Sequence, residues 1–295
     1  MRFFALMAFS IAHALDDGYT NMVPPLLPVF AALYNLNKAE LGTLMLALTI
    51  PANFLQPVFG LFLDRHRYRG SAALGLLLAL LGIAWMALGH SVAVLALGLL
   101  VAGLGTALFH PAAGSWVGEI GGEKRRTTAF SVFSSVGAVG YAGGAVAGPL
   151  LYKHYGMEGL VWAVVIALAW ALVVFAAERQ QDRTVSSHGP LGEMWDQRHG
   201  LGSVVLTTTL RSATIGAFSM FLPLLIVERG QSLMAGGGAL FGFLLASSVG
   251  LALGGAADRW GRRRLTLVSL VVGAPMLAVG SLLPGGSGLG LLWAG

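Results

Sequence analysis

The sequence contains no cysteine and little charge. The absence of Cys among its 295 residues excludes disulfides, thiolate nucleophiles and cysteine-based metal sites. Charged residues make up only 11% of the chain, against 56% hydrophobic residues. This balance leaves too little polar surface to cover a water-soluble domain, so apolar surface must face lipid. The composition predicts an all-α polytopic membrane protein.

The motifs of soluble enzymes are missing as well. The sequence has no phosphate-binding Walker loop and no His-Glu-x-x-His, and the glycines at 103 and 105 do not complete a dinucleotide fingerprint. No polar cluster offers a nucleophile, a base and oxyanion donors together. We therefore predict no enzyme activity, no cofactor and no metal. The net charge of +5 is spread over short clusters between apolar runs, which argues against a nucleic-acid partner.

Apolar stretches recur along the whole chain, each near the roughly 20 residues that cross a hydrocarbon core of about 30 Å. They predict nine membrane-spanning helices, at 3–33, 41–63, 71–89, 92–117, 127–152, 159–176, 201–227, 235–257 and 265–283. With a cytoplasmic N-terminus, most of the 18 Lys and Arg residues fall inside, and only Lys38, Lys153 and Arg229 fall outside. The first span also imitates a signal peptide, but its length favours a retained helix. We expect a multi-pass protein of the cytoplasmic (inner) membrane.

A polar stretch and an internal repeat divide the chain. Residues 177–200 predict a cytoplasmic linker between a six-helix bundle at 1–176 and a partial bundle of about three helices at 201–295. A Gly-x-x-x-Asp-Arg turn follows the second span and recurs after the eighth. Its residues are Gly60, Asp64 and Arg65 in the first copy, and Gly254, Asp258 and Arg259, followed by Gly261 and Arg262, in the second. Either copy alone is equally compatible with a plain interfacial charge cluster, and together they predict a gating loop. Two six-helix halves would require three further helices after Gly295.

The first span carries a polar stripe at helical spacing. Its members are His13, Asp17, Thr20, Asn21 and Pro24, and Asp16 precedes Asp17 in the same span. Ionisable groups within a membrane cannot face lipid, so Asp17, with His13 and Asp16, predicts a proton-coupling site, and Thr20 and Asn21 predict contacts to a substrate. Alternatively, one Asp reaches the outer interface or caps a helix break before Pro24.

Two further spans carry polar groups, near mid-depth in the seventh span and toward the end of the fourth. Arg211 in the seventh span predicts either a binding group for an anionic substrate or a structural ion pair with Asp17. In the fourth span, His110 stands between Phe109 and Pro111, which predicts a proton relay or only a kinked packing helix. We also count Phe109 among the substrate-binding candidates.

The fifth span carries a ridge of small residues that allows helices to approach closely. It consists of Gly140, Gly144, Gly148 and Pro149. We predict helix packing for this ridge, without a specific role in antiport.

Several strings, in order, resemble the fosmidomycin-resistance branch of the major facilitator superfamily. They are Ala12 to Asp17, Pro25 to Pro28, Leu55 to Gly60, Phe109 to Pro111, Gly148 to Leu151 and Gly254 to Arg264. The resemblance implies the major facilitator fold and a proton-driven exporter of small, often anionic drugs, with His13 and Asp17 matching the family's first-helix pair. The sequence departs from the pattern of this branch at Ala112, where an acidic residue is expected. Arg211 also lacks a clear counterpart among the drug exporters of the branch.

We therefore predict a proton-coupled secondary transporter, working as a monomer in the lipid bilayer, that exports small drugs or metabolites by alternating access. An importer of organic acids or sugars is one alternative. A non-transporting membrane sensor or scaffold with the same fold is another.

Overall fold

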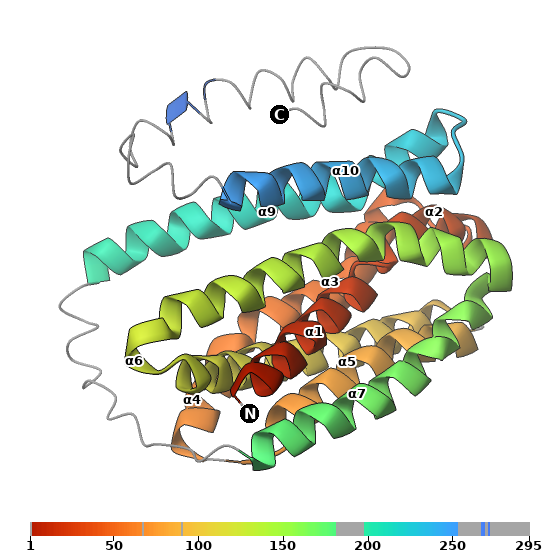
Figure 1. Cartoon of the computed structure of the whole chain (residues 1–295). Coiled ribbons are helices and arrows are strands. Elements are labelled where there is room, and N and C mark those ends of the chain that lie inside the picture. Colours follow the sequence, from red (N-terminus) through yellow and green to blue (C-terminus); the bar gives the residue numbers. More distant parts are fainter. Residues whose placement is uncertain are drawn as a thin grey trace.

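The computed structural model describes residues 2–66, 68–89, 91–180, 198–252, 267, 268 and 271. Throughout these ranges the chain forms helices joined by short turns, without strands, as the composition predicts (Figure 1). The elements are α1 (Arg2–Thr20), α2 (Val23–Tyr34), α3 (Lys38–Phe54), α4 (Gln56–Arg65), α5 (Ser71–Trp85), η1 (Met86–Leu88), α6 (Val92–Tyr155), η2 (Gly156–Val161), α7 (Trp162–Arg179), α9 (Arg198–Glu228) and α10 (Leu233–Ala252). The predicted ninth span lies outside the described residues, apart from three positions.

Prolines interrupt the first two predicted spans. The span expected at 3–33 is α1 followed by α2, because Pro24 and Pro25 have no backbone N–H to continue the ladder of hydrogen bonds. The span expected at 41–63 is α3 followed by α4, which Pro57 separates at Leu55 in the same way. A capping box in which Asn37 and Glu40 bond each other's backbone N–H fixes the start of α3.

The fourth and fifth predicted spans are joined more tightly than expected. Instead of a loop over 118–126, α6 reverses direction at Gly122 alone, where φ is 57° and ψ is −172°. Only glycine adopts this backbone conformation without steric cost. The two limbs of α6 then run in opposite directions, from Val92 to Gly121 and from Glu123 to Tyr155 (Figure 1).

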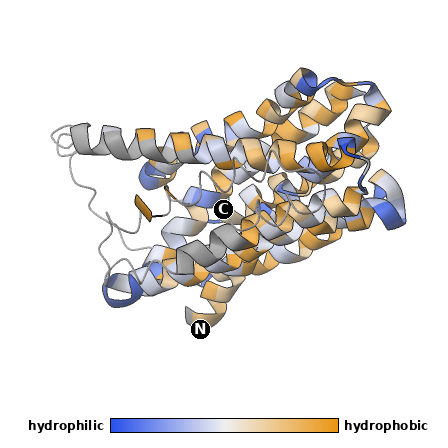
Figure 2. Cartoon of the chain, turned by 90° about the horizontal axis from the view of Figure 1, so that it is seen from above, coloured by the Kyte–Doolittle hydropathy of each residue, from blue (hydrophilic) through white to orange (hydrophobic). Residues whose placement is uncertain are grey.

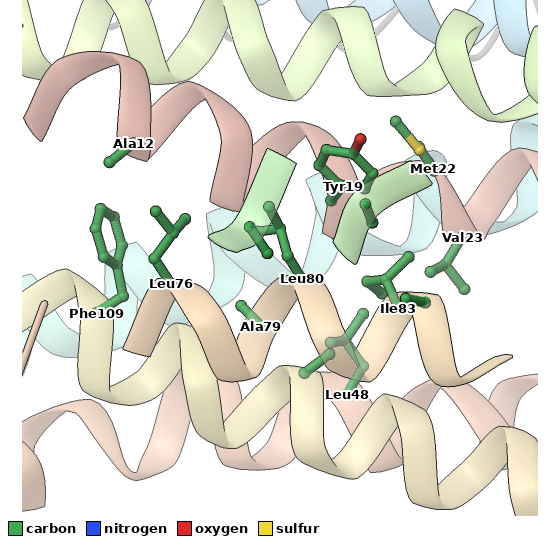
Figure 3. Packing of buried hydrophobic residues seen from close by; sticks show 14 of the residues in the cluster. Ala12, Tyr19, Met22, Val23, Leu48, Leu76, Ala79, Leu80, Ile83 and Phe109 are labelled. Carbon is green, nitrogen blue, oxygen red and sulfur yellow. The ribbon is translucent and has the colours of Figure 1, made fainter. Parts of the chain in front are cut away.

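The bundle is organised around α1, which packs against α6, α7 and α5. Its buried face meets the core formed by α5 and the first limb of α6, where Leu76, Leu80 and Phe109 are almost completely buried (Figure 3). Glycines bring α5 and α6 close together, since a Cβ at Gly82 would overlap the backbone of Ala102. Such contact between backbones stabilises helix pairs in lipid, where apolar side chains gain little by leaving their surroundings.

The outer surface of the helices is apolar. Hydrophobic residues run along the helices, whereas hydrophilic ones gather toward their ends (Figure 2). Large side chains such as Leu172 and Val139 are 69% and 63% exposed. Within the described residues, the helical runs Lys38–Arg65, Ser71–Leu88 and Val92–Arg179 are long and apolar enough to cross a membrane, and the last contains the fourth to sixth predicted spans. Two shorter apolar segments are Ser212–Glu228 and Leu233–Leu245.

The predicted linker starts too early. Helix α7 continues to Arg179, so residues 177–179 belong to the bundle. Glu178 is fully buried, and its Oε1 accepts hydrogen bonds from the backbone N–H of Ala72 at 2.9 Å and the indole Nε1 of Trp116 at 3.2 Å. The carboxylate thereby caps α5, which is why this charged residue stays inside.

Helices α9 and α10 lie side by side along one face of the bundle (Figure 1). Helix α10 packs on α6 and α9 packs on α2. Gly237 permits this approach, because a Cβ there would overlap the carbonyl oxygen of Ala145. At the start of α3, Lys38 Nζ lies 2.9 Å from Glu228 Oε2 at the end of α9.

Candidate functional site: an ionisable cluster between α1 and α6

One face of α1 and the first limb of α6 bring four ionisable side chains together. His13, Asp16 and Asp17 come from α1, and His110 comes from α6. Asp16 is fully buried and His13 is 8% exposed. The side chains of Asp17 and His110 are 21% and 23% exposed, so the cluster is partly open at these two residues. His110 lies within the first limb of α6, and Asp16 and Asp17 lie in the last turn of α1, so the cluster places ionisable groups inside an apolar bundle.

The two carboxylates pair with the two imidazoles. His13 Nε2 lies 3.1 Å from Asp17 Oδ2, and His110 Nε2 lies 3.4 Å from Asp17 Oδ1. The other carboxylate, Asp16, accepts a hydrogen bond from the hydroxyl of Thr106 at 3.3 Å. Its Oδ2 faces His110 Nδ1 at 3.6 Å, too long for a hydrogen bond. Asp17 is therefore the shared partner of both histidines.

Backbone carbonyls fix the orientation of both imidazoles. His13 Nδ1 lies 3.0 Å from the carbonyl oxygen of Phe133, and His110 Nδ1 lies 3.0 Å from that of Thr106. A carbonyl only accepts, so each Nδ1 must carry the hydrogen. Each Nε2 is left to face Asp17.

The ring of His13 fits into a slot in the second limb of α6. It stacks on Phe133 with centroids 4.1 Å apart and an interplanar angle of 18°. The ring also meets Gly137, where any Cβ would overlap the imidazole. The ring of His110 stands at 90° to that of His13, with centroids 5.0 Å apart. Both limbs of α6 thus hold the cluster in place.

The predicted substrate-binding residues are less accessible than expected. Phe109 is fully buried in the core, so in this conformation it offers no surface to a solute (Figure 3). Asn21 is 2% exposed and donates from Nδ2 to the carbonyl of Tyr141 at 2.7 Å. Thr20 bonds back to the carbonyl oxygens of Asp16 and Asp17. These contacts are structural, and substrate binding by the three residues stays a prediction.

Other predicted residues lie apart from the cluster or outside the described part. Arg211 belongs to α9, but its side chain is not among those described. Asp64 and Arg65 are exposed at the end of α4, and Gly60 packs near Pro111. The second copy of the turn, with Gly254, Asp258, Arg259, Gly261 and Arg262, lies outside the described residues.

The small-residue ridge of the second limb of α6 faces α1. A Cβ at Gly140 would overlap Ala14, and one at Gly144 would overlap Gly18. Gly148 approaches Met22, and Pro149 lies beside Gly237 of α10. The ridge thus brings the backbone of α1, with its cluster, against α6.

A pocket of ≈ 320 Å³ lies apart from the cluster. Apolar side chains of α9 line it, with Lys38 and Glu228 at its edge. None of the residues that the sequence singles out for proton or substrate binding takes part.

Sequence reasoning missed three residues that shape the cluster. Thr106 bonds Asp16, Phe133 supports His13, and Gly137 makes room for it. One signal was available for Gly137, which stands three residues before Gly140 and seven before Gly144, on the same helix face as the ridge. Thr106 and Phe133 carry no such signal.

The fold and its buried cluster agree with what sequence comparison finds. The profile of the Major Facilitator Superfamily matches residues 9–295, and the chain belongs to this family of membrane transporters. The chain is 27% identical to the uncharacterised major-facilitator-type transporter YfnC of Bacillus subtilis, over 93% of this chain and 70% of that protein. It is 25% identical to the fosmidomycin resistance protein of Escherichia coli, also over 93% of this chain and 70% of that protein.

Solved structures give the same fold. A bacterial homologue of the human lysosomal transporter Spinster, inward-facing and unoccupied, superposes with a TM-score of 0.77 at 16% identity, over 99% of this chain and 71% of that one. A D-xylose–proton symporter superposes with a TM-score of 0.69 at 13% identity, over 99% of this chain and 78% of that one. At these identities the likeness shows the fold alone. The predicted family and fold are confirmed, and proteins of this family are generally not enzymes.

Proposed function

We propose that this protein is a secondary transporter that exports a small solute in exchange for protons by alternating access. The observation that carries the proposal is the cluster of His13, Asp16, Asp17 and His110. Structural ion pairs inside a membrane bundle join one acid to one base at the least cost. This cluster instead joins two acids and two bases and stays partly open.

Such a cluster can couple proton binding to movement. Asp17 contacts both imidazoles, so taking up or releasing one proton changes the net charge of the whole group. The free energy of holding that charge in an apolar bundle depends on whether water reaches it. Conformations that open the cluster to opposite sides therefore differ in proton affinity, and protonation shifts the balance between them.

A contact between the two proposed units suits a rocking movement. Gly237 of α10 meets the carbonyl of Ala145 in the second limb of α6, so that backbone lies against backbone without a side chain between them. The Lys38–Glu228 pair joins the start of α3 to the end of α9, on the side we propose as outer. This contact supports a state closed to the outside. We propose 1–179 and 198–295 as the two moving units, joined by a linker over 180–197.

Export is favoured over import by the relatives. The fosmidomycin resistance protein, by its name, protects its cell from a drug, and it is 25% identical to this chain. The sugar symporter resembles the chain in fold only. We propose small, including anionic, solutes as the substrate class, with Arg211 as the candidate anion-binding group. We further propose a monomer in the inner membrane, with its N-terminus in the cytoplasm.

The test is proton flux in liposomes. Purified protein is reconstituted with a pH gradient, and anionic and neutral drugs are added while an internal pH-sensitive dye is followed. We expect at least one drug to start a proton flux, and Asp17→Asn to abolish it because the amide cannot exchange the proton. Glu158→Gln, at an exposed carboxylate of η2, is the matched control and retains the flux.

Thermal unfolding of each variant in detergent shows whether it folds. A folded Asp17→Asn variant that keeps its pH-dependent flux contradicts the assignment of Asp17. If the rate of drug transport by the wild-type protein does not depend on the pH gradient, proton coupling is contradicted altogether.

A further inference from the structure

We propose that His13, Asp17 and His110 form a binding site for a divalent transition metal of the zinc class. The inference concerns the same cluster as the proposed function, but it rests on donor geometry and not on transport. Two imidazole nitrogens and one carboxylate are brought together by α1 and the first limb of α6, which are far apart in the sequence. The sequence itself predicts no metal.

The arrangement of the imidazoles is the first argument. Both Nδ1 atoms bond backbone carbonyls, of Phe133 and of Thr106, and both Nε2 atoms point at Asp17. Metal-binding histidines almost always donate their second ring N–H to such an acceptor, which fixes the tautomer and aims the lone pair at the metal. In the neutral imidazoles both lone pairs converge on the carboxylate, which leaves an electron-rich centre that attracts a cation.

The distances between the donor atoms are the second argument. Ligands about 2.0–2.1 Å from a tetrahedral ion stand roughly 3.3 Å from each other. Here Asp17 Oδ2 lies 3.1 Å from His13 Nε2 and Asp17 Oδ1 lies 3.4 Å from His110 Nε2. One ligand atom from each of the three residues lies within 4.8 Å of the other two. A small rotation of the side chains would close this set around one ion.

The donor set also selects the metal. Imidazole suits zinc and its neighbours among the transition metals, whereas magnesium and calcium require oxygen ligands. Three protein ligands leave a further coordination position for water or an anion. Because Asp17 and His110 are partly exposed, an ion can reach the cluster at these two residues.

A bound ion would block the proposed proton step. Each Nε2 atom has one lone pair, which holds either a metal or a proton. Zinc that reaches the cluster should therefore stop proton-coupled transport.

The test measures binding of Zn²⁺ alone. Protein without a polyhistidine tag is titrated with Zn²⁺ in detergent by calorimetry, and Co²⁺ absorption spectra report the ligand geometry. We expect one saturable site per chain, with nitrogen and oxygen ligands, that excess Mg²⁺ does not displace. Substituting His13→Ala or His110→Ala should each weaken binding at least about 100-fold, as loss of a direct ligand exceeds typical losses in the outer shell. His66→Ala, which removes an exposed histidine after α4, is the matched control and binds as the wild type does.

Thermal unfolding with and without Zn²⁺ guards against misfolded variants, since a ligand stabilises only a folded site. No saturable binding by the folded wild-type protein overturns the inference, as does binding that both His13→Ala and His110→Ala retain. A wild-type protein that shows Asp17-dependent proton flux but binds no zinc overturns the metal site and leaves the proposed function intact. Zinc binding by a protein that shows no proton flux overturns the proposed function and leaves the metal site intact.

Discussion

At the scale of single residues, the cluster depends on a position without a side chain. Gly137 lies against the imidazole of His13, which also stacks on Phe133. The ring is thereby held where Nε2 meets Asp17. A residue that makes no polar contact thus decides the geometry of an ionisable site.

We expect Gly137→Ala to displace His13 and reduce the Asp17-dependent proton flux strongly. Forcing an extra methyl into a packed site costs about 1–3 kcal/mol, so thermal stability should also fall. Gly143→Ala is the matched control on the same limb of α6, because nothing lies within 4 Å of its Cβ. That variant should be neutral or slightly more stable, since alanine is the better helix former. Equal fluxes in the two variants would show that Gly137 does not position His13.

At the scale of the helices, buried polar groups fix the ends of elements that hydropathy alone places only roughly. Glu178 holds the start of α5 from the end of α7, and it lies beyond the boundary that the sequence suggests. A carboxylate that accepts from a backbone N–H at a helix start also interacts favourably with the helix dipole.

Substituting Glu178→Ala should therefore destabilise the bundle. It leaves the N–H of Ala72 and the indole N–H of Trp116 buried without this acceptor, and each such loss costs about 1–3 kcal/mol. Glu158→Ala, at an exposed glutamate, serves as the control and should change little. The measurement is thermal unfolding in detergent. An unchanged midpoint for Glu178→Ala would refute its role as the cap of α5.

At the scale of the whole molecule, α9 and α10 meet the remaining helices along α2 and the second limb of α6. The Lys38–Glu228 pair adds a contact between α3 and α9, where both side chains are well exposed to water, at 65% and 44%. An exposed pair of this kind contributes at most about 1 kcal/mol, so it can open and close during transport.

The absence of cysteine allows a direct test of that movement. With Lys38→Cys and Glu228→Cys combined, a short cleavable thiol cross-linker should join α3 to α9 and stop drug-dependent transport. Reducing the linker should restore transport, because the block is mechanical. The two single variants, treated alike, should transport normally. Full transport by the cross-linked protein would show that these two ends need not separate.

Much of this protein follows from its sequence alone. Hydropathy determines the helical spans, since a bilayer leaves an α-helix few alternatives, and ordered motifs in the first, second and fourth spans indicate the family. The stripe that contains His13 and Asp17 on one helix face could also be predicted, because helical spacing is local. The exact end of α7 could not be predicted in this way.

Only the tertiary structure brings His110 to Asp17, seats His13 against Phe133 and Gly137, and buries Phe109 in the core. These relations join residues that are distant in the chain, and no spacing rule connects them. They depend on how α1 packs between the limbs of α6, which the turn at Gly122 and the close-packed glycines decide. Local sequence thus determines the helices and the polar groups they carry, whereas packing determines which of those groups meet.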